Sequence, residues 1–178
     1  MGVQSLSIDE LLAILAAAKA KRERDWLMML VGFAHGLRPS EVVALTPDNI
    51  HDGMITVQRL KGSMRTTQPL LEHENPLLNE CEPLTHWALL CGPKQRLFKV
   101  GRQHFWRLFR AYADASDIPA HKAHPHVLKH SIAMQIIGTA GIEKTRQYLG
   151  HKSISSTGEY LKTTDAEASA AVGKALKL

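Results

Sequence analysis

The sequence predicts a mainly α-helical domain that carries one small antiparallel β-sheet, an α+β fold. Apolar residues recur at helical spacing along most of the chain, and two short strand-like runs flank a turn that contains glycine. A length of 178 residues suits one domain with a substantial buried core. The predicted helices cover residues 7–18, 24–35, 39–45, 76–91, 102–116, 126–140, 142–149 and 153–161.

Local signals mark the ends of the first three helices. Ser7 and Glu10 have the spacing of a capping box, which satisfies free backbone N–H groups at a helix start. Gly36 is a natural stop for the second helix, because glycine adopts the left-handed conformation at low cost. Pro39 suits the first turn of the third helix, and this places Arg38 where that helix begins.

The sheet is predicted between the third and fourth helices. Residues 54–58 (MITVQ) and 66–71 (TTQPLL) have strand character, and the segment RLKGSMR joins them. Gly62 and Ser63 supply the turn. Pro69 lacks a backbone N–H, so the second strand is expected at an edge of the sheet.

Composition narrows the class of protein. No apolar run approaches the roughly 20 residues that span a bilayer, and no segment resembles a signal peptide. We therefore expect a cytoplasmic protein in which Cys81 and Cys91 are reduced. The formal charge of +5 favours a polyanionic partner such as nucleic acid, although many basic domains bind none.

The segment HPHVLKH, residues 124–130, gathers three histidines. His126 and His130 are four residues apart, a spacing that can point two metal ligands to one helix face. Val127 stands where a zinc hydrolase of this motif has glutamate, and no cysteine or carboxylate nearby completes a site. We therefore expect no metal and no cofactor, with His121 and His124 as loop residues.

Five motifs in order identify a family. The segments HGLRPSEVVALTPDNI, LKGSMRTTQPL, HVLKHSIA, YLGHKSIS and STGEYLK resemble the catalytic domain of the tyrosine recombinases, the phage integrase family. The family pattern is an arginine in G-L-R-x-S-E, a lysine on a β-hairpin, H-x-x-R-H, L-G-H and a tyrosine nine residues after that last histidine. The resemblance covers residues 7–164 and implies the catalytic core fold of these enzymes.

The resemblance also implies a role for each matching residue. Tyr160 is the expected nucleophile, Lys61 the acid for the leaving oxygen, and His126 the base that takes the tyrosine proton. Arg38, Lys129 and His151 are expected to hold the non-bridging oxygens of the scissile phosphate. Two further residues are expected to support the site: Glu41, and His130 in a structural role.

One position departs from the family pattern. The H-x-x-R-H box has Lys129 where the second arginine belongs, which keeps a positive charge and loses the planar fork of donors. If the pocket has the family geometry, Lys129→Arg should speed cleavage, and the sequence favours this outcome. If the pocket has adapted to lysine, the longer guanidinium should collide with its neighbours.

The implied activity is site-specific cleavage and rejoining of double-stranded DNA through a 3′-phosphotyrosine, without metal or ATP. The implied assembly on DNA is a homotetramer, whereas the isolated domain is expected to be a monomer. Accessory DNA-bending proteins are further expected partners. Two alternatives stay open: a DNA-binding module that kept the fold and lost the chemistry, and strand relaxation like that of a type IB topoisomerase.

The expected domain organisation has three parts. Residues 1–6 are expected to be a leader or an expression remnant, and residues 7–164 the catalytic domain. Family members usually carry a DNA-binding domain before the catalytic one, and no such domain fits before residue 7. We therefore expect an isolated catalytic domain. Residues 165–178 form a short, alanine-rich tail that is expected to dock on its own domain or on a neighbouring protomer.

Overall fold

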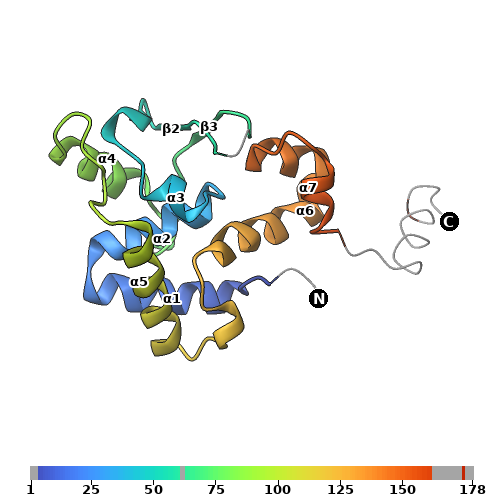
Figure 1. The fold of residues 1–178 in the computed structure, drawn as a ribbon, viewed down its shortest axis with the longest axis horizontal. Coiled ribbons are helices and arrows are strands. Elements are labelled where there is room, and N and C mark those ends of the chain that lie inside the picture. The colour runs from blue at the N-terminus through green and yellow to red at the C-terminus, as the bar shows by residue number, and fades with distance from the viewer. Residues whose placement is uncertain (1–3, 61–62, 162–173, 175–178) are drawn as a thin grey trace.

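The computed structural model describes residues 4–60, 63–161 and 174. The predicted acid Lys61, the start of the leader and almost all of the tail therefore lie outside the described residues. Within the described ranges, seven α-helices and a three-stranded antiparallel sheet confirm the predicted fold class (Figure 1).

The second helix lies at the centre of the fold, and the first packs against it. α1 (Ile8–Lys21) begins at the predicted capping box, where the Glu10 N–H donates to Ser7 Oγ at 3.1 Å and the Ser7 N–H donates to Glu10 Oε2 at 2.7 Å. α2 (Glu23–Ala34) has only buried residues from 25 to 34. Because it is covered on every side, α2 is the central helix, and α1 packs along it.

The corner after α2 begins at the predicted glycine. Gly36 has φ +57°, and a Cβ atom there would lie 2.6 Å from Leu149 Cδ2, so both conformation and space favour glycine. α3 (Pro39–Val42) has the predicted proline in its first turn and Arg38 as its N-cap residue. The predicted continuation to residue 45 is wrong, because the chain leaves the helix after Val42.

The sheet has one more strand than the sequence predicted. β1 (Ile50–His51), β2 (Met54–Val57) and β3 (Thr66–Pro69) are antiparallel in the order β1-β2-β3, which confirms β3 as an edge strand. β1 is only two residues long and has no periodicity to detect. The Asp52–Gly53 turn that joins it to β2 has two positive φ angles, as in the two-residue hairpin turns that favour Asp-Gly.

One of the helices after the sheet, α4 (Cys81–Leu90), begins later than predicted. It starts five residues after the predicted residue 76. The Leu77 carbonyl accepts a hydrogen bond from Trp26 Nε1 at 2.9 Å, so α2 holds this segment in a non-helical path. α5 (Arg102–Ala115) agrees closely with the prediction. Two short 3₁₀ helices were not predicted: η1 (Pro47–Asn49) and η2 (Ala120–Lys122).

α6 (His126–Leu149) contains the histidine box, and Tyr160 follows α7 (Ser155–Gly158). α6 also contains Gly141 with φ 77° and ψ 169°, which is the break predicted between residues 140 and 142. α7 is shorter than the predicted helix at 153–161. In Figure 1, α6 runs from the body of the molecule outward to α7.

Two apolar clusters hold the fold together. The larger one includes the buried faces of α1 and α5 and most of α2. The smaller one joins α6 to the residues after α7 and consists of Ala133, Ile137, Leu149 and Tyr160. Cys81 and Cys91 are free thiols. No helix among the described residues is long and apolar enough to cross a membrane.

Replacing Gly150 by alanine should destabilise the fold by about 2 kcal/mol or more. Gly150 ends α6 with φ +70°, and a Cβ atom there would lie 2.9 Å from both Arg59 Cγ and the Met64 carbonyl oxygen. Gly138→Ala is the matched control, because nothing lies within 4 Å of a Cβ atom at that helical position. Urea unfolding of the two variants measures the difference, and equal midpoints would contradict the prediction.

Candidate active site

Six of the predicted site residues line one open pocket of about 440 Å³. Three of these side chains lie on α6, and the other three lie just before α3, just after α6 and just after α7. The six residues are Arg38, His126, Lys129, His130, His151 and Tyr160. Folding thus gathers side chains from three distant parts of the sequence around one space.

Arg38 and Glu41 form a connected pair at the start of α3. Arg38 Nη1 donates to Glu41 Oε1 at 3.0 Å, and Glu41 Oε2 accepts the Arg38 backbone N–H at 2.7 Å. Glu41 Oε1 also accepts the Leu60 N–H at 2.9 Å, which ties the hairpin to α3. Burial alone would raise the pKa of Glu41, but the two backbone donors and the charges of Arg59 and Lys129 lower it below its ordinary value. Glu41 is therefore a buried carboxylate that holds Arg38 in place.

Lys129 is buried and faces backbone oxygens. Lys129 is only 5% exposed. Its Nζ donates to the Gly36 carbonyl at 3.0 Å and to the Leu149 carbonyl at 3.3 Å. Burial, followed by the nearby charges of Arg59 and Arg38, lowers the pKa of Lys129 to about 7. Lys129 thus lines the pocket as an amine whose charge is easily lost at neutral pH.

Tyr160 and His130 are hydrogen-bonded to each other. Tyr160 is 3% exposed, and its hydroxyl lies 2.9 Å from His130 Nδ1. Burial and the neighbouring Glu159 raise the pKa of Tyr160, so the phenol keeps its proton at neutral pH. Burial lowers the pKa of His130, so a neutral imidazole can accept that proton at Nδ1. The sequence expected His126 to be the base and His130 to be structural, whereas the geometry brings His130 to the hydroxyl.

His151 lies at the end of α6 and contacts α7. Its Nδ1 is 3.0 Å from Thr157 Oγ1, and both residues are buried. Burial, with the positive charges of Lys129 and Arg38, lowers the pKa of His151 to about 4. When the Thr157 hydroxyl donates to Nδ1, the neutral ring keeps its proton on Nε2 and can donate it to an anion.

The sequence interpretation overlooked one residue that contacts several parts of this site. Arg59 follows β2 and is 2% exposed, and its guanidinium approaches Glu41 Oε2 at 3.5 Å. An arginine near the end of a strand, beside a predicted hairpin turn, is usually solvated. Nothing in the sequence pattern indicates that Arg59 is buried.

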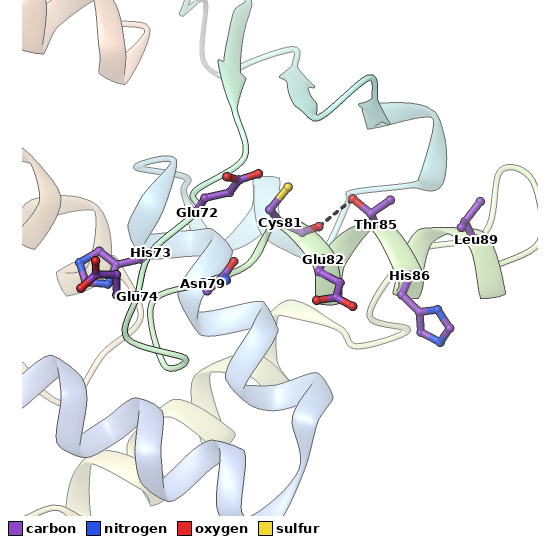
Figure 2. Close-up of a pocket in the computed structure, with 9 residues that line it drawn as sticks. All are labelled: Glu72, His73, Glu74, Asn79, Cys81, Glu82, Thr85, His86 and Leu89. Atoms are coloured by element: carbon purple, nitrogen blue, oxygen red, sulfur yellow. Dashed lines mark hydrogen bonds between the residues drawn. The ribbon is translucent and has the colours of Figure 1, made fainter.

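A larger pocket, of about 860 Å³, lies elsewhere on the protein. Figure 2 shows its lining from the 72–79 loop and α4, with Glu72, Glu74 and Glu82 among the side chains drawn. It shares no lining residue with the pocket at Tyr160. Because three carboxylates would repel a phosphodiester, this pocket is not suited to hold DNA. Among the described residues, no group of His, Cys, Asp and Glu side chains could hold a metal ion.

Comparison with known proteins agrees with the motifs. Tyrosine recombinase XerD of Pasteurella multocida is 32% identical over 147 residues, which are 77% of this chain and 49% of that protein. The solved structure of the catalytic domain of bacteriophage HP1 integrase has a TM-score of 0.66 and 24% identity, covering 96% of this chain and 94% of that one. A lambda integrase tetramer bound to a Holliday junction has a TM-score of 0.69 and 20% identity, covering 92% of this chain and 50% of that one.

The chain spans about half the length of the curated relative, and the two solved structures share its fold. The statistical model of one family matches residues 4–167, nearly the whole chain. The chain therefore belongs to the phage integrase family.

Proposed function

We propose that this chain cleaves and rejoins double-stranded DNA at a specific site through a covalent 3′-phosphotyrosine at Tyr160. The observation that carries the proposal is the hydrogen bond between the Tyr160 hydroxyl and His130 Nδ1, in a pocket that also contains Arg38, Lys129 and His151. A nucleophile, a proton acceptor and three side chains that can donate hydrogen bonds to a phosphate thus surround one space large enough for a phosphodiester.

The first half of the reaction joins Tyr160 to phosphorus. The Tyr160 oxygen attacks the scissile phosphate while its proton passes to His130, which is neutral at pH 7 because of its lowered pKa. The pentacoordinate transition state has extra negative charge on its non-bridging oxygens. Arg38 supplies positive charge there, Lys129 does so in its protonated form, and His151 supplies a neutral donor, so the transition state is stabilised more than the ground state.

The second half releases the 5′ oxygen. The bond between phosphorus and that oxygen breaks, and the oxygen takes a proton from Lys61, the acid implied by the family resemblance. The described residues beside Lys61 support this role: the Leu60 carbonyl accepts from Arg38 Nη1 at 3.3 Å, and Ser63 Oγ lies 3.4 Å from the same atom. The hairpin is thereby tied to the phosphate-binding arginine.

The phosphotyrosine preserves the energy of the broken bond. Attack by a free 5′-hydroxyl on this linkage restores a phosphodiester and releases Tyr160, so strand exchange requires neither ATP nor a metal ion.

Chelation of divalent metals should therefore leave the cleavage rate unchanged. The measurement is single-turnover cleavage with and without EDTA at constant ionic strength, because DNA affinity depends strongly on salt. A loss of activity in EDTA that zinc restores would instead support a metal site at the histidine box.

A DNA duplex with a nick next to the cleavage site tests the proposal directly. After cleavage the short 5′-hydroxyl fragment diffuses away, so the protein–DNA adduct accumulates and migrates slowly in a denaturing gel. Binding without an adduct would support the DNA-binding module. Relaxation of supercoiled plasmid without exchange between two marked sites would support the topoisomerase-like alternative.

A tetramer on DNA is the assembly that the lambda integrase structure supports for this chain. We expect a monomer in the absence of DNA, and a four-protomer complex on DNA that carries two recombination sites. Accessory DNA-bending proteins would belong to the full recombination complex. Analytical ultracentrifugation of the protein with and without DNA measures both states.

A further inference from the structure

We propose that Arg59 is a positioning residue for cleavage: it holds the backbone and the carboxylate that place Lys129 and Arg38 against the scissile phosphate. This inference rests on the proposed function for its kinetic consequence, while the link between Arg59 and Lys129 can be measured without DNA.

The buried Arg59 side chain connects four segments through hydrogen bonds and an ion pair. Its Nε donates to Thr66 Oγ1 at 2.8 Å, and its Nη1 donates to the Gly36 carbonyl at 3.1 Å. Its Nη2 donates to the His35 carbonyl at 2.8 Å and to the Tyr148 carbonyl at 3.4 Å. The start of β3, the corner after α2 and the end of α6 therefore share one guanidinium.

The fourth segment is α3, through Glu41. Arg59 Nη1 lies 3.5 Å from Glu41 Oε2, and Glu41 in turn binds Arg38. Because the Arg59 side chain is 0% exposed and that of Glu41 is 1% exposed, water hardly screens this ion pair. Removing the guanidinium leaves a buried carboxylate with one cation fewer, and Arg38 loses its fixed anchor.

The Gly36 carbonyl connects Arg59 to Lys129. Arg59 Nη1 and Lys129 Nζ both donate to this oxygen, at 3.1 and 3.0 Å. The two cations thus share one acceptor, and the Arg59 charge contributes to the lowered pKa of Lys129, second only to burial. The other charged or titratable groups near Lys129 come from α3, α6 and the segments that flank α7: Arg38, Glu41, His130, His151 and Glu159.

The close fit at Gly150 adds independent support. A Cβ atom at Gly150 would lie 2.9 Å from Arg59 Cγ, and the Met64 N–H donates to the Gly150 carbonyl at 2.9 Å. The stem of Arg59 therefore packs directly on the L-G-H turn that precedes His151. Arg59 and Met64 flank residues 60–63, so both ends of the segment that contains Lys61 are fixed to the same turn.

Arg59→Met and Arg59→Lys test the proposal, with Arg24→Met as the matched control. Arg24 pairs with Asp25 at the start of α2. This is about 15 Å along the helix axis from the end of α2, where Arg59 binds the His35 carbonyl. We expect Arg59→Met to slow single-turnover cleavage of the nicked duplex about 100-fold, because misplaced donors cost about that factor. Affinity for uncleaved DNA should change less than about threefold, since a buried side chain contacts no phosphate. Arg24→Met should cleave at the wild-type rate.

The titration of Lys129 separates positioning from simple loss of stability. In free protein with ¹³C-labelled lysine, the Lys129 Cε signal of Arg59→Met should titrate at a pH about one unit higher than in wild type, because a nearby positive charge is lost. Arg59→Lys keeps the charge, so its titration should remain near that of wild type. Its cleavage should nevertheless be at least about tenfold slow, because one ammonium cannot replace the planar fork.

Two results would overturn the proposal. One is cleavage by Arg59→Lys and by any folded Arg59→Met at the wild-type rate. The other is slow cleavage by Arg59→Met together with an unmoved Lys129 titration, which would assign Arg59 to stability alone. If wild-type protein forms no adduct, the proposed function fails instead, and the titration still decides whether Arg59 controls Lys129.

Discussion

Tyr160→Phe should abolish the covalent protein–DNA adduct while DNA binding stays within about twofold of wild type. The change removes one hydroxyl, so the ring still packs in the cluster of Ala133, Ile137 and Leu149. Loss of the hydrogen bond to His130 should cost about 1 kcal/mol of stability. The nucleophile is lost, whereas the side chains that bind the phosphate remain. Cleavage should therefore be lost while DNA affinity is kept. Denaturing gels of the nicked duplex measure the adduct, and a gel shift with intact duplex measures affinity.

Tyr112→Phe is the matched control for this substitution. Tyr112 is also buried, and its hydroxyl donates to Asp25 Oδ2 at 2.8 Å, but Tyr112 does not line the pocket at Tyr160. It should lose a similar amount of stability and keep the wild-type cleavage rate. An adduct that persists in Tyr160→Phe would place the nucleophile at another tyrosine, Tyr148 or Tyr112.

Lys129→Arg should slow cleavage by about tenfold or more, which reverses the expectation from the sequence. An arginine at 129 would gain a fork of donors only if the fork reached the phosphate oxygens. In the structure the space around Lys129 Nζ is taken up by the Gly36 and Leu149 carbonyls and by Arg59, which shares the Gly36 oxygen. A longer, planar group must displace one of these neighbours, and overpacking of this kind costs about 1–3 kcal/mol.

Single-turnover cleavage and urea unfolding of the same preparation measure this prediction. Lys122→Arg is the matched control, because Lys122 pairs with Glu10 at 2.9 Å on a partly exposed surface where arginine also fits a carboxylate. It should have wild-type stability and rate. Faster cleavage by Lys129→Arg would show that the pocket keeps the family geometry, as the sequence first indicated.

Much of the fold was predictable because its signals are local. The capping box at Ser7 and Glu10, the stop at Gly36 and the break at Gly141 depend on the conformation of a few neighbouring residues. The same holds for the edge position of Pro69, which follows from a missing N–H. The errors lie where tertiary contacts override local preference, as at residues 76–80, which α2 holds through the bond from Trp26 to Leu77.

The sequence by itself determined the family, the order of the motifs and six of the side chains that line one pocket. Only the tertiary structure decided that His130 contacts Tyr160, that Lys129 is buried against backbone carbonyls, and that Arg59 joins four segments. The physical reason is the distance along the chain: His130 and Tyr160 are 30 residues apart, and Arg59 and Tyr148 are 89 apart. Burial and hydrogen-bond partners at such separations are set by how the segments pack, and no local pattern encodes them.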